Sequence, residues 1–169
     1  MKGSKPLKYW DSCIFIAWLK NEPNDQSVID GMEETVRQVD SGKIRLLTSV
    51  VTLTEILEGH MTPDQFKQFQ DFFKRKNVQM ANHDQRIGTL SQEIRNYHLQ
   101  QNVKLSTPDC LHLATAIIHN ANEFHTLDGS GKKKTGKLIP LSGNVAGKYK
   151  LKICEPYAAQ GSLLTQLPS

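Results

Sequence analysis

Two kinds of hydrophobic pattern alternate along the chain. Short apolar runs occupy 7–10, 44–50, 77–80, 123–127 and 149–154. Between them, hydrophobic residues recur at helical spacing in the segments 13–19, 27–40, 53–58, 63–75, 84–100 and 107–120. Strands that alternate with helices are typical of an α/β domain with a mainly parallel sheet. We therefore predict a three-layer α/β/α domain with four to five strands.

The whole pattern fits one domain over residues 1–155, followed by a flexible polar tail at 156–169. Thr62-Pro63 and Thr107-Pro108 each predict a helix start, because a Thr cap and a Pro in the first turn suit the unpaired amides there. Phe66, Phe69, Phe72 and Phe73 lie roughly on one helical face. Core packing is the favoured interpretation of this face, and a groove for a partner helix is the alternative.

Charge is distributed unevenly along the 169 residues. The chain carries a net charge of +4, but residues 129–152 contain seven lysines and no acid, which leaves −3 for the remainder. The glycine- and lysine-rich loop 129–148 makes up most of this segment. Its charge suits polyanion binding on one surface. A solvated lysine-rich loop explains the charge equally well.

Membrane proteins and disulfide scaffolds are excluded by two further features. The longest apolar run, 13–19, has seven residues, against the ~20 that a spanning helix needs. Three cysteines without a CxxC pair favour a reducing compartment, so we expect a cytoplasmic protein.

Four acidic residues stand where predicted strands end or the next helices begin. They are Asp11, Glu55, Asp109 and Asp128. In a parallel α/β sheet, strand ends and following helix starts gather at one edge, where ligands bind. We therefore expect these carboxylates to face one volume.

Each acid also has a purely structural explanation. Asp11 suits a helix cap, and Asp109 suits the positive end of a helix dipole. Thr52 and Glu55 have the spacing of a capping box, and Asp128 precedes glycine in a common turn pair. For any one residue the structural explanation is favoured, whereas the shared edge favours a functional cluster.

Convergent carboxylates repel one another, by ~1 kcal/mol for a pair 4 Å apart in water and ~4 kcal/mol at intermediate dielectric. Such a cluster is stabilised by protons or by a cation. Oxygen ligands favour Mg²⁺ or Mn²⁺ over Zn²⁺. An ion of this kind binds phosphate oxygens, lowers the pKa of an attacking water and stabilises the departing alkoxide. Together with the lysines, the acids predict metal-assisted hydrolysis of a nucleic-acid backbone.

Four segments, in this order, resemble the PIN-domain ribonucleases, and most closely the VapC toxins of bacterial toxin–antitoxin pairs. They are LKYWDSCIFIAWL, TSVVTLTEILEG, STPDCLHLATA and FHTLD, within residues 7–155. The resemblance implies a PIN-like parallel sheet between helices, and RNA cleavage that depends on Mg²⁺ or Mn²⁺. It also implies a homodimer and a small antitoxin protein that covers the site.

The resemblance also assigns residues. Asp11, Glu55, Asp109 and Asp128 match the family's acidic positions, which hold metal and carry catalysis, and Ser12 and Thr126 match hydroxyl positions that support them. The candidates for holding RNA are Lys132, Lys133, Lys134 and Lys137. The chain departs from the family pattern after Asp128, where glycines replace a further acid and a phenylalanine, and the segment up to residue 148 is longer.

Other functions stay open. A non-catalytic RNA- or protein-binding module could retain the same fold. A phosphatase would carry a second Asp two residues after Asp11, where Cys13 stands instead. His112 and His119 are seven residues apart on one predicted helix, too far for paired metal ligation, so a zinc site with Cys110 is the less favoured interpretation.

Overall fold

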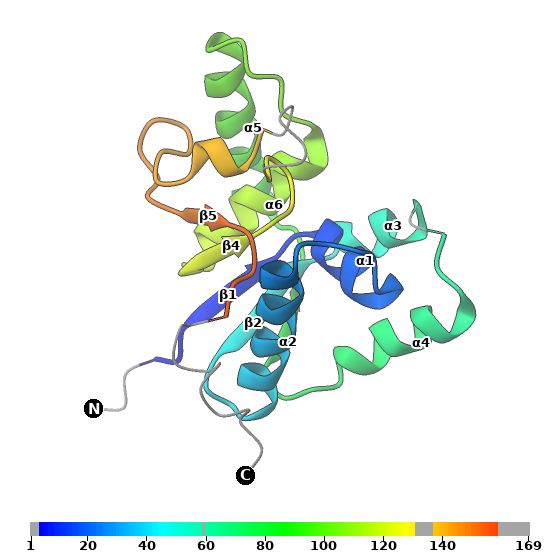
Figure 1. Ribbon diagram of the computed structural model, residues 1–169. Coiled ribbons are helices and arrows are strands. Elements are labelled where there is room, and N and C mark those ends of the chain that lie inside the picture. Colours follow the sequence, from blue (N-terminus) through cyan, green and yellow to red (C-terminus); the bar gives the residue numbers. More distant parts are fainter. Residues whose placement is uncertain (1–3, 59, 131–136, 159–169) are drawn as a thin grey trace.

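The computed structural model describes residues 4–58, 60–130 and 137–158 of the chain (Figure 1). Its strands are β1 (Leu7–Trp10), β2 (Arg45–Ser49), β3 (Val78–Ala81), β4 (Glu123–His125) and β5 (Lys152–Cys154). Its helices are α1 (Ser12–Lys20), α2 (Gln26–Asp40), α3 (Val51–Glu58), α4 (Pro63–Phe72), α5 (Gln85–Gln100) and α6 (Thr107–Ile118), with a 3-10 turn η1 (Ile139–Leu141).

These strands form one sheet in the order β3-β2-β1-β4-β5, and each neighbouring pair is parallel. Helices cover both of its faces (Figure 1). The predicted three-layer fold with a mainly parallel sheet of four to five strands is therefore confirmed. Because all the strands run the same way, β1, β2 and β4 end at the same edge of the sheet.

Strand β1 shows how the two layers of core are built. Its side chains alternate between the faces of the sheet, so Leu7 and Tyr9 pack on one side with residues of α5 and α6. Trp10 packs on the other side with residues of α1, α2 and α4. Tyr9 and Trp10 are both fully buried, which leaves little freedom for the backbone that leads into Asp11.

The phenylalanines of α4 belong to this second layer. Phe69 and Phe72 are each about 1% exposed, and Phe66 and Phe73 pack against the same cluster. The ring centre of Phe72 lies 6.2 Å from that of Trp10 in a stacked arrangement. Core packing is therefore the right interpretation of this helical face, and the partner-groove alternative is wrong for its buried members.

The ends of several elements differ from the prediction. Helix α4 ends at Phe72 rather than at residue 75, and β5 covers only 152–154 because Val145 and Tyr149 close a turn before it. Helix α6 is capped by Ser106 rather than Thr107. The Ser106 hydroxyl accepts from the amide of Asp109 at 3.1 Å, and the Asp109 carboxylate accepts from the Ser106 amide at 3.0 Å.

After β5 the chain crosses α2 at Gly31. A Cβ at Gly31 would lie 2.3 Å from the carbonyl carbon of Pro156, so only glycine permits this approach. Pro156 is buried and the Tyr157 hydroxyl donates to Glu123, while residues 159–169 of the predicted tail lie outside the described residues.

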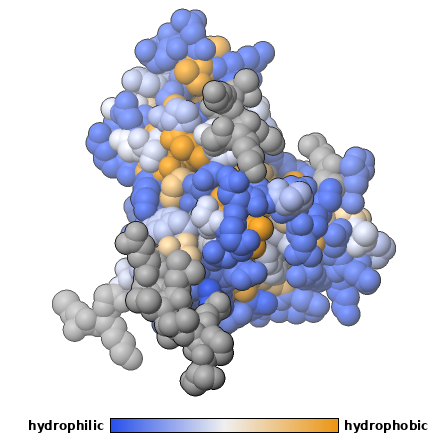
Figure 2. Space-filling view, viewed as in Figure 1, coloured by the Kyte–Doolittle hydropathy of each residue, from blue (hydrophilic) through white to orange (hydrophobic). Residues whose placement is uncertain are grey.

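Hydrophilic residues dominate the face of the molecule shown in Figure 2. In the part of the chain that the structure describes, no helix has both the length and the apolar character needed to cross a bilayer.

Candidate metal centre at the carboxyl edge of the sheet

A cavity of about 420 Å³ opens at the edge where β1 and β4 end. Its lining residues are Asp11, Ser12, Cys13, Ile16, Glu22, Glu55, Asp109, Leu127 and Asp128. All four acids singled out from the sequence are among them, and Glu22 adds a fifth carboxylate. Within the described residues, no lysine or arginine lines this cavity.

Asp11 is the most firmly held of these acids. It caps α1, where one carboxylate oxygen accepts from the Ser12 amide at 2.8 Å, and it is only 6% exposed. Its other oxygen accepts from the Thr126 hydroxyl at 2.8 Å. The Thr126 hydroxyl in turn accepts from the amide of Asp128 at 3.1 Å. Thr126 thus joins Asp11 to the segment that carries Asp128, while the Ser12 amide holds the other oxygen of Asp11.

Glu55 is held by a residue on another helix. Its Oε2 lies 2.6 Å from His112 Nε2, which is itself 3.6 Å from Asp11 Oδ1. Thr52 is not the cap of α3, because the helix already begins at Val51, and the Thr52 hydroxyl bonds with that of Thr48 at 2.7 Å. Glu55 therefore serves the cavity rather than the helix start.

His112 is fully buried, and its other ring nitrogen lies 2.6 Å from the hydroxyl of Tyr9. Burial alone would lower the pKa of His112, but the hydrogen bond with Glu55 and the nearby charges of Asp11, Glu55 and Asp109 raise it. Burial likewise opposes the charge of Glu55, and the contact with His112 outweighs it and lowers the pKa of Glu55. A protonated His112 would offset part of the negative charge of these acids.

Asp109 lies one turn before His112 on α6. Burial raises the pKa of Asp109, and the negative charges of Asp11 and Asp128 raise it further. The hydrogen bonds of Asp109 with Ser106 lower this pKa but do not outweigh burial. The mutual repulsion expected of convergent carboxylates is therefore present in the folded protein.

Sequence reasoning missed the contacts of His112 with Glu55 and with Tyr9. The spacing of Asp109 and His112, three residues apart on a helix, places both on one face and was the available signal. The zinc site suggested for His112 and Cys110 is not supported by the structure. The ring nitrogens of His112 contact Tyr9 and Glu55, and Cys110 is buried in the hydrophobic core. Burial and the charge of Asp11 raise the pKa of the Cys13 thiol, which favours a packing role for it.

The predicted basic loop is only partly described. Lys132, Lys133 and Lys134 lie outside the described residues. The amide of Lys137 donates to both carboxylate oxygens of Asp128 at 3.3 Å, and its ammonium group donates to the carbonyl of Lys104 at 2.6 Å. Elsewhere in the described part of 129–152, Lys148 pairs with Glu93 on α5 and Lys152 pairs with Glu123 on β4.

The cavity fits a hard divalent cation. The four acids predicted from the sequence come from four separate segments and supply the carboxylate oxygens that Mg²⁺ and Mn²⁺ prefer. The Cys13 thiol also lines the cavity, and it donates to Asp11 at 3.4 Å. Ligand atoms of Asp11, Glu55 and His112 all lie within 4.8 Å of one another. These three residues, with Asp109 and Asp128 on the same cavity, could hold the ion.

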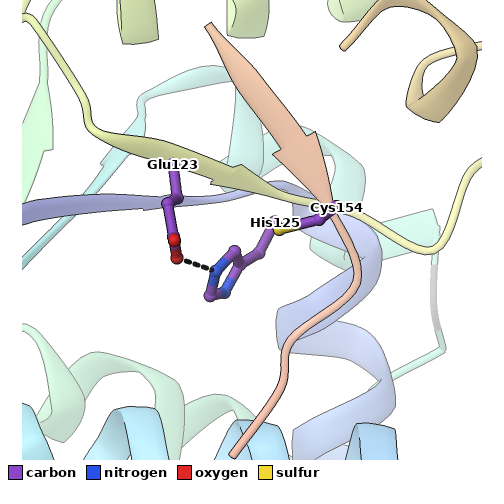
Figure 3. Close-up of side chains that lie close together, drawn as sticks. All are labelled: Glu123, His125 and Cys154. Atoms are coloured by element: carbon purple, nitrogen blue, oxygen red, sulfur yellow. Dashed lines mark hydrogen bonds and ion pairs between the residues drawn. The ribbon is translucent and has the colours of Figure 1, made fainter. Parts of the chain in front are cut away.

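A second group of donor atoms lies on β4 and β5, and none of its residues lines this cavity. Glu123, His125 and Cys154 are neighbours there, and Glu123 accepts from His125 at 3.0 Å (Figure 3). The Glu123 carboxylate also accepts from the Lys152 ammonium at 2.7 Å and from the Tyr157 hydroxyl. A carboxylate that is already neutralised in this way stabilises the fold and is a poor metal ligand.

Residues 8–136 match the family described as the PIN domain. The chain belongs to the PIN-domain family. Solved structures with the same fold include VapBC2 from Rickettsia felis bound to a DNA fragment from its promoter, with a TM-score of 0.59 and 14% identity over 75% of this chain and 92% of that one. FitAcB from Neisseria gonorrhoeae has a TM-score of 0.52 and 17% identity, over 88% and 97%.

A third PIN-fold structure is VapC20 from Mycobacterium tuberculosis, described as a toxin that cleaves the sarcin–ricin loop. Its TM-score is 0.52 and its identity 11%, over 77% of this chain and 96% of that chain. At such identities these likenesses establish the fold. No curated protein matches the chain significantly in sequence.

Proposed function

We propose that this PIN-domain protein is a divalent-metal-dependent endoribonuclease and the toxin of a toxin–antitoxin pair. The observation that carries the proposal is the convergence of five carboxylates on one cavity that no described lysine or arginine neutralises. A cation at this position relieves their repulsion and supplies an attachment point for a phosphate group.

In this proposal each acid has a position that its neighbours maintain. Thr126 and the Ser12 amide orient Asp11, and the Ser106 amide orients Asp109. These acids, with Glu55 and Asp128, would hold Mg²⁺ or Mn²⁺. The bound ion would lower the pKa of a water molecule and stabilise the departing alkoxide. Unpaired carboxylate oxygens in the cavity would accept the proton that the attacking water loses.

The RNA backbone would lie along the side of the cavity where Lys137 is found. Lys137 contacts both Asp128 and the exposed Lys104, and Arg95 reaches the start of α6 through the Thr107 hydroxyl at 2.8 Å. The backbone of Lys137 adjoins Asp128, and Arg95 bonds to a residue two positions before Asp109, while neither side chain lines the cavity. They can therefore bind phosphates on either side of the scissile bond while the acids hold the ion.

The partner proposal follows from the structures with the same fold, two of which are VapBC and FitAcB complexes. We propose that a small antitoxin binds this protein and covers the cavity, and that the protein forms a homodimer. Co-purification of the chain with the product of an adjacent short reading frame, and loss of RNA cleavage in that complex, would be the expected result.

The direct test is cleavage of RNA by the purified protein with Mg²⁺ or Mn²⁺. We expect products with a 5′-phosphate and a 3′-hydroxyl, because an activated water attacks rather than the 2′-hydroxyl. Asp11→Asn, which keeps the side-chain shape and the cap, should lower the rate at least about a hundredfold. Circular dichroism before and after heating shows whether that variant is folded.

Two outcomes would contradict the proposal. Cleavage that survives both EDTA and Asp11→Asn would indicate a contaminating nuclease or a different mechanism. Salt-dependent RNA binding without cleavage at any divalent ion would favour the non-catalytic module. For the basic side, Lys137→Glu should weaken RNA binding, whereas Lys150→Glu, placed near Ile117 at the far end of α6, should have little effect.

A further inference from the structure

We infer that His112 is itself a ligand of the metal ion. The centre would then have a mixed carboxylate–imidazole donor set, which selects Mn²⁺ and similar transition ions over Mg²⁺. This inference rests on the proposed function, because it assumes that the acids of the cavity hold an ion. It goes further by adding a nitrogen donor to the site and by choosing between the two metals.

The position of His112 Nε2 supports this role. It lies 2.6 Å from Glu55 Oε2 and 3.6 Å from Asp11 Oδ1, so the nitrogen faces two of the carboxylates rather than the core. Two donors each about 2.1 Å from one ion are about 3.0 Å apart at right angles and about 4.2 Å apart when opposite. The distance to Asp11 falls in this range. The distance to Glu55 needs to open by only a few tenths of an ångström.

The other side of the ring is prepared for ligation. A metal-binding histidine usually fixes its second nitrogen by a hydrogen bond. Here Nδ1 lies 2.6 Å from the Tyr9 hydroxyl, which is fully buried, and 3.5 Å from the Ser49 hydroxyl. As a metal ligand through Nε2, His112 would carry its ring proton on Nδ1 and donate it to the Tyr9 oxygen. That arrangement leaves the lone pair of Nε2 free to face the cavity.

A nitrogen donor has a predictable effect on ion choice. Mg²⁺ is a hard ion that binds oxygen and keeps its waters, whereas imidazole suits the first-row transition ions. Replacement of one oxygen ligand by Nε2 therefore strengthens Mn²⁺ binding relative to Mg²⁺. If His112 only positioned Glu55 through a hydrogen bond, its loss would weaken the binding of both ions alike.

Pulsed electron paramagnetic resonance of the full chain with one equivalent of Mn²⁺ is the direct test. We expect nitrogen hyperfine modulation from a bound imidazole in the wild-type protein. It should be lost in Asp11→Asn, which would assign the coupled nitrogen to this cavity. It should persist in His119→Gln, a matched control, because His119 is an exposed histidine at the end of the same helix.

Calorimetric titration gives the second readout. We expect Mn²⁺ to bind the wild-type protein at least about tenfold more tightly than Mg²⁺. His112→Gln should lower Mn²⁺ affinity by at least about tenfold and change Mg²⁺ affinity much less. An equal loss for both ions, or bound Mn²⁺ without nitrogen modulation in the wild-type protein, would overturn the inference.

The wild-type spectrum carries the test even if His112→Gln fails to fold. The outcomes for the two proposals are also separable. RNA cleavage together with Mn²⁺ that lacks a nitrogen ligand would leave the nuclease function standing and remove the role of His112. Nitrogen-coupled Mn²⁺ without RNA cleavage would support the metal centre and contradict the nuclease.

Discussion

The carboxylate of Glu123 should stabilise the folded protein at neutral pH and lose this effect in acid. It accepts hydrogen bonds from the buried His125, from Lys152 and from Tyr157, and Lys8 lies 3.8 Å away. Burial opposes its charge, but these partners outweigh burial and hold the pKa of Glu123 far below its usual value. Glu123→Gln keeps the shape of the side chain and removes the charge.

The size of the effect follows from the exposure of each partner. A hydrogen bond to a charged group contributes about 1.5–3 kcal/mol. The Glu123 side chain is 14% exposed, but that of Lys152 is 51% exposed, so solvent screens the contribution of the lysine. We expect Glu123→Gln to cost about 2 kcal/mol at pH 7. In a domain of this size that lowers the melting temperature by about 4–8 °C.

The pH dependence has a definite sign. Because the folded pKa is depressed, the unfolded chain takes up a proton first as the pH falls. The stabilisation is complete above about pH 4.3 and then declines by about 1.4 kcal/mol per pH unit. The difference between wild type and variant should therefore almost vanish by about pH 3.

Urea unfolding at pH 7 and at pH 3, followed by circular dichroism, measures both quantities. Glu93→Gln is the matched control, since Glu93 pairs with Lys148 at 2.7 Å but the two side chains are 43% and 58% exposed. That variant should cost less than about 0.5 kcal/mol. Equal costs for the two variants, or a Glu123→Gln cost that persists at pH 3, would refute the reasoning.

Two further predictions concern the packing and the cavity. Gly31→Ala should cost about 1–3 kcal/mol in urea unfolding, because its new methyl group would overlap Pro156. Gly88→Ala, in open space on α5, should instead stabilise by about 0.5–1 kcal/mol. A Gly31→Ala variant as stable as the wild type would contradict the close approach. Thr126→Val removes the hydroxyl bonded to Asp11 and should weaken Mn²⁺ binding by about tenfold or more in calorimetry, and unchanged affinity would show that Asp11 needs no such support.

Much of the fold could be predicted because its local signals agree with one another. The apolar runs and helical spacings located each strand and helix, and the alternation of the two identified a parallel sheet. The ends were less predictable. Residues 149–151 have the same apolar and polar pattern as a strand, but Val145 pairs with Tyr149, and this turn shortens β5 to three residues. Such a tertiary contact leaves no periodic trace in the sequence.

The acids of the cavity could be predicted from the ends of strands, but the contact of Glu55 with His112 could not. The position of Asp11 or Asp128 at the sheet edge follows from the backbone, since any residue directly after a parallel strand reaches that edge. The bond between Glu55 and His112 joins residues 57 positions apart and depends on how α3 and α6 pack. Strand ends alone therefore cannot predict it.

The same contact changes how the charge of the cavity is understood. Counted from the sequence, the edge holds only acidic groups, and no side-chain cation balances them. In the folded protein a buried histidine already lies between Asp11 and Glu55, so a proton and a metal ion can each balance the same carboxylates. The metal affinity of this PIN domain should then depend on the residue three positions after Asp109 as much as on the acids themselves.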